Sequence, residues 1–161
     1  MPTLRGEIPM FDPISVPFGA KMLFNTVRLK PGVSVEDVEL AIGEMCNVVK
    51  CAYGGDKGGF IAGQVFRFTG FVSDEGSLGT VAAEDHLAIV TYWRSFAEHE
   101  RSHADALFNA KFGALVEMCS DTKELGYEML WQGESEAKVT MEGAAAHSAW
   151  RARRRRAISS S

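Results

Sequence analysis

Four stretches of the chain alternate hydrophobic and polar residues with a period of two, which is the pattern of half-buried β-strands. The first stretch covers residues 21–30. The others are the aromatic-rich residues 60–72, the β-branched run 86–93 and the alternating residues 127–134. Stretches rich in glycine or polar residues separate them, so we predict four strands.

Two stretches between these strands repeat hydrophobic residues at helical spacing instead. Each begins with a capping box, a serine followed three residues later by an acidic residue, at Ser34 and at Ser95. The first predicted helix covers residues 34–50, and the second runs from Ser95 to about Met118. The order strand, helix, strand, strand, helix, strand predicts an α+β fold, the ferredoxin-like βαββαβ unit.

The second predicted helix separates its polar residues from its histidines. At about 100° per residue, one side carries polar residues that we expect to face solvent: Glu98, Ser102, Asp105 and Asn109. His99 and His103 lie on a flank away from that side.

The two ends of the chain differ from the predicted α+β unit. Four prolines among residues 1–19 exclude a helix there and predict an extended N-terminal arm. Five arginines between Arg151 and Arg156 lie in residues 136–161, which we predict to be a flexible basic tail. The ferredoxin-like domain then covers residues 20–135.

The composition of the 161 residues is that of an ordinary globular protein, with 46% hydrophobic and 24% charged residues. No apolar run approaches the roughly 18 residues of a membrane span, and the N-terminus lacks the apolar core of a signal peptide, so we expect a cytoplasmic protein without a membrane partner. Removing the five tail arginines from the 17 Lys and Arg leaves 12 against 21 acidic residues, which argues against a nucleic-acid partner. The three cysteines are too few for a disulfide scaffold, so we expect free thiols.

The predicted sheet carries both helices on one face and leaves the other face bare. The aromatic second strand indicates that this bare face is apolar. Two copies of the chain would bury it by packing their sheets face to face, which predicts a homodimer, a dimeric α+β barrel, or a larger homo-oligomer.

The strongest chemical signal is the pair His99 and His103, which are four residues apart and project from one side of the predicted helix. Two such imidazoles can bind one metal ion. The stretch also fits His-Glu-x-x-His, the zinc-protease pattern, with Glu124 or Glu128 at a suitable spacing for a third ligand. Its place at the start of a helix in a small βαββαβ unit argues against a protease. Hydrogen-bonded packing histidines are an equal alternative.

A histidine pair with one carboxylate is also the ligand set of a non-heme iron(II) site, which keeps open positions for dioxygen and substrate. Glu128 and Glu134 point to the same side of the predicted fourth strand, so either could supply the carboxylate. The thiol of Cys51, at the end of the first predicted helix, would be a better nucleophile beside a metal. An inert thiol is the alternative for this cysteine.

The βαββαβ order, with TYWRS leading into the second helix, resembles the dimeric α+β barrel superfamily, which includes antibiotic-biosynthesis-type and heme-degrading monooxygenases. In its motifs the chain is most similar to the sulfur oxygenase reductases. In that family a cysteine ends the first helix ahead of a Gly-Phe pair, as Cys51 does ahead of Gly59-Phe60. Two histidines open its second helix, as His99 and His103 do here.

This resemblance, which covers residues 34–134, implies an oxygenase that acts on inorganic sulfur or a small sulfur compound. It implies one mononuclear non-heme iron with these ligands: His99, His103 and either Glu134 or Glu128. It also implies that Cys51 is catalytic and carries the sulfur. Because sulfur oxygenase reductases contain two such halves in about twice this length, the chain would pair with itself.

Two other functions fit the sequence. A cofactor-independent monooxygenase of the antibiotic-biosynthesis type needs only a pocket and no metal. A non-enzymatic dimer would bind a small ligand and use its histidines structurally. The heme-degrading branch matches less well, because Asn25 fits its first-strand asparagine but Trp93 precedes the helix on which that branch carries a tryptophan.

Overall fold

The computed structural model describes residues 12–69, 71–72, 79–80 and 86–140. The chain is divided into two units. Residues 15–132 form one compact unit. Of the second unit, residues 12–14 and 133–140 are described, and they form neither a helix nor a strand.

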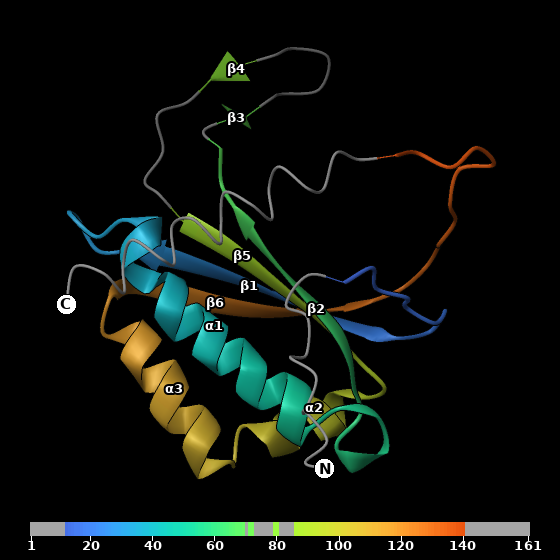
Figure 1. The fold of residues 1–161 in the computed structure, drawn as a ribbon, viewed down its shortest axis with the longest axis horizontal. Helices are drawn as coiled ribbons and strands as arrows, with labels where there is room; N and C mark the ends of the chain where they lie inside the picture. The colour runs from blue at the N-terminus through green and yellow to red at the C-terminus, as the bar shows by residue number, and fades with distance from the viewer. Residues whose placement is uncertain (1–11, 70, 73–78, 81–85, 141–161) are drawn as a thin grey trace, which may run out of the picture. The chain divides into compact units, whose positions relative to one another are not determined.

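The compact unit contains the strand and helix order that the sequence predicts, with additional short elements (Figure 1). In chain order the elements are β1 (Lys21–Leu29), α1 (Val35–Ala52), the 3₁₀ turn η1 (Gly55–Lys57), β2 (Phe60–Arg67), β3 (Phe71–Val72), β4 (Gly79–Thr80), β5 (His86–Trp93), α2 (Phe96–Ser102), α3 (Ala106–Val116) and β6 (Cys119–Glu128).

Four strands form one antiparallel sheet in the order β2-β5-β1-β6, and β3 pairs with β4 in a separate two-stranded sheet. Since β5 lies between β1 and β2, and β1 lies between β5 and β6, both crossovers are the split βαβ connections of a ferredoxin-like fold. The α+β prediction is therefore confirmed. The predicted second strand, residues 60–72, is too long, because β2 ends at Arg67.

The helices cover one face of the sheet, with α1 and α3 side by side (Figure 1). α1 starts where predicted, because Ser34 and Asp37 form both hydrogen bonds of a capping box. It buries apolar residues at helical spacing: Val35, Val38, Ile42, Met45 and Val49. Every second residue of β1 and β5 faces them, since alternate side chains of a strand share a face: Leu23, Val27, Leu29, Leu87, Ile89 and Trp93.

The opposite face of the sheet carries apolar side chains that are partly exposed. Phe66 on β2 and Leu125 and Tyr127 on β6 point to this face in the strand register. Their exposed fractions are 50%, 48% and 45%. We refer to the face that carries these three residues as the open face. Their exposure agrees with the bare apolar face that the sequence predicts.

The second predicted helix is wrong in its length, because the structure divides it into α2 and α3. The Asp105 carboxylate accepts a hydrogen bond from the backbone N–H of Phe108 at 2.9 Å and so caps a new helix. The Asn109 side chain donates to the carbonyl of His103, at the end of α2, at 2.9 Å. Such side-chain hydrogen bonds compete with the helix at a point where hydrophobic periodicity alone predicts continuity.

The fourth predicted strand, residues 127–134, is also misplaced. β6 begins earlier, at Cys119, and ends at Glu128. Residues 121–126, which lie outside the predicted strand, pair with β1. This earlier register brings Glu124 into the middle of the strand.

The three cysteines are free thiols, as expected. Cys119 is buried and Cys51 is exposed. Burial raises the pKa of Cys46 to about 11, so this thiol is a poor nucleophile at neutral pH. Within the described residues, no helix is both long and apolar enough to cross a membrane.

Candidate metal centre

A network of polar side chains fixes the junction between β5 and α2. Ser95 caps α2, and its hydroxyl accepts a hydrogen bond from the backbone N–H of Glu98 at 3.2 Å. The Glu98 carboxylate in turn accepts hydrogen bonds from the Ser95 hydroxyl at 2.9 Å and from Nε and Nη2 of Arg94 at 2.9 and 2.6 Å. The hydrogen bond from Arg94 is the main reason that the pKa of Glu98 falls to about 2. The carboxylate is therefore charged at neutral pH and anchors the first turn of the helix.

The prediction that Glu98 and Ser102 face solvent is wrong. Glu98 is 8% exposed and Ser102 is 1% exposed. The Ser102 hydroxyl donates to the carbonyl of His99 at 2.6 Å, and Glu98 has the partners described above. Because each buried polar group is paired, its burial costs little free energy.

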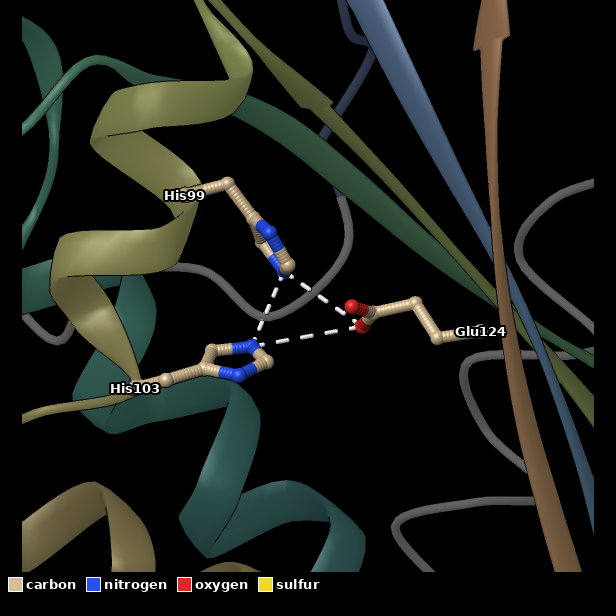
Figure 2. Close-up of side chains that lie close together, drawn as sticks. All are labelled: His99, His103 and Glu124. Atoms are coloured by element: carbon tan, nitrogen blue, oxygen red, sulfur yellow. Dashed lines mark hydrogen bonds and ion pairs between the residues drawn. The ribbon is translucent and has the colours of Figure 1, made fainter.

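α2 and β6 bring His99, His103 and Glu124 together, with the carboxylate facing both imidazoles (Figure 2). The Nε2 atoms of the two histidines are 3.0 Å apart. Oε2 of Glu124 lies 3.4 Å from Nε2 of His99 and 4.0 Å from Nε2 of His103. In the part of the chain that the structure describes, these residues form the one group of three potential metal ligands.

The three atoms are spaced as the ligands of a single ion are. A point equidistant from them lies about 2.1 Å from each, within the ~2.0–2.2 Å range of zinc bonds to histidine nitrogen and carboxylate oxygen. The longest edge of the triangle, 4.0 Å, joins His103 to Glu124. Both of these side chains reach solvent, so they can approach each other when a cation attracts them.

The centre is closed on one side and open on the other. The His99 side chain is 6% exposed, whereas those of His103 and Glu124 are 41% and 33% exposed. Partial burial raises the pKa of Glu124, but the hydrogen bond with His99 and the electrostatic influence of both histidines outweigh it, so the pKa lies below its ordinary value. Glu124 is thus ionised at neutral pH, which is the form that binds a cation.

Aromatic rings restrain both imidazoles. Trp93, which is 1% exposed, contacts His99 edge-on with 5.2 Å between ring centroids. Phe108 stacks on His103 with 5.6 Å between centroids. These contacts limit rotation of the imidazoles and hold their Nε2 atoms toward Glu124, so the arrangement is organised before any ligand binds.

The third position of the cluster falls to Glu124 and not to the predicted Glu128. Both residues point to the helix-covered side of β6. Glu128 lies opposite Lys21 and pairs with it at 2.9 Å, and this hydrogen bond lowers the pKa of Glu128. From the sequence, Glu124 is a possible ligand only through its spacing in the protease pattern. The short alternation within residues 124–128, where Leu125 and Tyr127 alternate with Glu124 and Glu128, is the one signal of a strand there.

Glu134 and Cys51 are not part of this cluster. Glu134 belongs to the unit made of residues 1–14 and 133–161, and the histidines belong to the unit of residues 15–132. Cys51 lies in the last turn of α1, where its thiol donates to the Asn47 side chain at 3.5 Å. The catalytic role of Cys51 stays a prediction.

The fold is similar to several solved structures. SnoaB, a cofactor-independent oxygenase from Streptomyces nogalater, matches with a TM-score of 0.54 at 10% sequence identity, over 71% of this chain and 96% of its own. A protein assigned as an antibiotic biosynthesis monooxygenase from Caulobacter crescentus has a TM-score of 0.54 at 13% identity, over 71% and 92%. A dimeric ferredoxin-like protein of unknown function from Thermobifida fusca has a TM-score of 0.53 at 12% identity, over 73% and 100%.

At such low identities these similarities establish the ferredoxin-like fold alone. None of the three is described as a sulfur oxygenase reductase, so they give no support to that narrower resemblance. No protein-family model matches the chain, and no curated protein matches it.

Proposed function

We propose that this chain is an oxygenase-type enzyme that binds one iron(II) ion through His99, His103 and Glu124. The observation that carries this proposal is the convergence of two Nε2 atoms and one carboxylate oxygen, 3.0 to 4.0 Å from one another. The fold supports the oxygenase class, because SnoaB and the Caulobacter protein share it.

The ligand types favour a transition metal over calcium or magnesium, which prefer oxygen ligands. Two imidazoles and one carboxylate on one side of an ion leave its other positions free for dioxygen and substrate. Bound iron(II) would supply the one-electron chemistry that dioxygen requires. Zinc fits the same three ligands but has no redox chemistry, so it does not fit an oxygenase.

The surroundings of the cluster assign different tasks to its members. His99 is buried against Trp93 and is held through its carbonyl by Ser102, so it is the fixed ligand. His103 and Glu124 face solvent, and a small substrate would approach on their side. The ionised Glu124 lowers the net charge of a bound divalent cation, which tunes its reactivity.

For the substrate we propose inorganic sulfur or a small sulfur compound, with Cys51 as the residue that carries it. Only the sequence resemblance supports this part. The exposed Cys51 thiolate would attack a polysulfide and release a shorter polysulfide, which leaves a persulfide on the cysteine. Mass spectrometry after polysulfide treatment should find the adduct on Cys51 and not on the buried Cys119. Absence of any adduct on Cys51 would contradict the proposed sulfur substrate and leave the iron proposal intact.

Metal analysis of purified variants tests the iron proposal. After iron(II) supplementation under anaerobic conditions, the wild-type chain should hold one equivalent of iron, and His99→Ala and Glu124→Gln should lose most of it. Glu128→Gln is the matched control, since it removes a carboxylate from the same side of the same strand. A metal-free wild type, or equal loss in Glu124→Gln and Glu128→Gln, would contradict the proposal.

A cofactor-independent oxygenase is the second candidate, and the comparisons favour it over an iron enzyme because SnoaB is described as cofactor-independent. The compact unit also has a hollow of about 280 Å³ whose lining does not include the three ligands. It is lined by aromatic and apolar side chains, such as Met22, Tyr92, Tyr127 and Trp131, and by the polar Glu128 and Gln132. An apolar substrate could bind there. Dioxygen consumption that persists after complete removal of metal would favour this candidate.

We also propose that the open face is covered by a second copy of the chain. The similar Thermobifida protein is described as dimeric, and the exposed Leu125 and Tyr127 would be buried in such a pairing. Sedimentation should find a dimer for the wild type and a monomer for Leu125→Lys. Leu40→Lys, at an exposed leucine of α1, should stay dimeric. A monomeric wild type would contradict this proposal.

A further inference from the structure

α2 is seated between two glycines, and one of them lies on the strand that carries Glu124. Gly59, just before β2, leaves the space that the Glu98 carboxylate occupies. Gly126, on β6, leaves the space that the ring of Phe96 occupies. A Cβ atom on Gly126 would lie 3.0 Å from Cε1 and 3.3 Å from Cζ of that ring, closer than the about 3.5–4.0 Å of an ordinary carbon–carbon contact. Only a glycine admits Phe96 at this position without displacing it.

The contact between Phe96 and Gly126 joins the same two elements that hold the metal ligands. Phe96, His99 and His103 follow one another at positions i, i+3 and i+7, so they lie on one side of α2. Gly126 and Glu124 are two residues apart on β6, so they point to the same face. The helix therefore meets the strand twice, once through the Phe96 ring and once through the imidazoles.

Other contacts prevent the Phe96 ring from moving aside alone. Nζ of Lys21 lies 5.8 Å from the centre of the ring, and Lys21 is itself paired with Glu128. The ring also packs against a buried cluster that includes Leu23 and Trp93. A side chain added at Gly126 would therefore push the ring together with the first turn of α2.

We propose that Phe96 and Gly126 form a positioning pair that sets the separation between the imidazoles of α2 and the carboxylate of Glu124. This inference deepens the proposed function and rests on it for the metal measurement. The separation between the imidazoles and the carboxylate can also be tested in the metal-free protein. Displacement of α2 by a few tenths of an ångström would move His99 relative to Glu124. Mutations of residues that orient metal ligands typically weaken metal affinity about 10- to 100-fold.

The test compares Gly126→Ala with Gly63→Ala, a matched strand glycine. An added Cβ at Gly63 would lie 3.4 Å from Cζ of Phe60 and 3.4 Å from the carbonyl oxygen of Val90, so it fits with less displacement than the added Cβ at Gly126, which would lie 3.0 Å from the ring of Phe96. In Co²⁺ titrations followed by the visible absorption of the ion, Gly126→Ala should weaken binding about tenfold. Gly63→Ala should leave the affinity and the spectrum unchanged.

The double variant Gly126→Ala/Phe96→Leu separates positioning from general destabilisation. Leucine lacks the ring atoms Cε1 and Cζ that meet the added methyl group, while the contact with Cδ1, at 3.8 Å, is an ordinary one. The double variant should therefore recover Co²⁺ affinity and spectrum, although it loses packing and unfolds at a lower temperature than Gly126→Ala. Failure to recover the affinity would overturn the positioning role.

A measurement on the metal-free protein distinguishes failure of this inference from failure of the proposed function. The imidazole NMR signals of His99 and His103 should shift in Gly126→Ala and return toward their wild-type positions in the double variant. Unchanged signals in Gly126→Ala would overturn the positioning pair. Shifted and restored signals in a protein that binds no Co²⁺ would support the pair and contradict the metal site.

Discussion

α1 and α2 pack on the same side of one sheet but bury opposite kinds of side chain. α1, with 18 residues, buries only apolar side chains, among them Val38 and Ile42. α2, with seven residues, buries three side chains, and all three are polar: Glu98, His99 and Ser102. Each of the three has a partner within the compact unit.

This contrast assigns different tasks to the two helices. Burial of apolar area contributes about 25 cal/mol per Å², so α1 stabilises the fold. Paired polar groups contribute little net stability but fix orientations, because a displaced group loses its partner. α2 therefore contributes less to the stability of the domain and more to the geometry of the three potential ligands.

The largest expected effect on stability comes from α1. Ile42→Ala should lower the free energy of unfolding by about 2–5 kcal/mol, since it removes buried methyl and methylene groups. Metal affinity measured at a temperature where the variant is folded should equal that of the wild type. Denaturant unfolding and Co²⁺ titration check the two parts. Weaker metal binding by a folded Ile42→Ala protein would contradict the assignment of stability to α1 and of site geometry to α2.

A smaller, pH-dependent effect is expected from α2. The pKa of Glu98 is about 2 in the folded protein, so its ion pair with Arg94 stabilises the fold fully above the ordinary value of 4.5. That stability is lost as the pH falls from 4.5 toward 2, because the unfolded chain takes up the proton first. Thermal unfolding should show a steeper loss over this range for the wild type than for Glu98→Gln. Parallel pH profiles would contradict the assigned ion pair.

The smallest changes compare the two N-caps directly. Ser34→Ala and Ser95→Ala should each cost about 1 kcal/mol, because each removes a hydroxyl that accepts a helical N–H. Only Ser95→Ala should also weaken metal binding, since it loosens the helix that carries His99. Equal metal affinities in the two variants would show that the N-terminus of α2 does not control the site.

The same contrast explains how far the sequence predicts this protein. α1 follows from its own residues, because the capping box at Ser34 and the apolar spacing are local signals. The burial of the polar side of α2 does not follow from the sequence of that helix in the same way. Glu98 is buried because it pairs with Arg94 and Ser95, and helical periodicity does not predict these hydrogen bonds. The break before α3 depends on the cap supplied by Asp105, which is a side-chain contact and not a hydrophobic one.

The candidate site is likewise predictable only where it depends on local sequence. His99 and His103 follow from their spacing along one helix. Glu124 requires the register of β6 against β1, a pairing between residues far apart in the chain, and a prediction that starts the strand late replaces it with Glu128 or Glu134. Hydrophobic alternation is present only within residues 124–128, and the polar residues 120–124 before it are equally typical of a turn.

X-ray absorption at the iron edge tests the central claim most directly. In anaerobically reconstituted wild-type protein, the spectrum should contain scattering from two imidazoles and a carboxylate, and Glu124→Gln should change the coordination while Glu128→Gln does not. Iron without imidazole scattering, or an identical spectrum in His99→Ala, would contradict the assignment of His99, His103 and Glu124 as the metal centre.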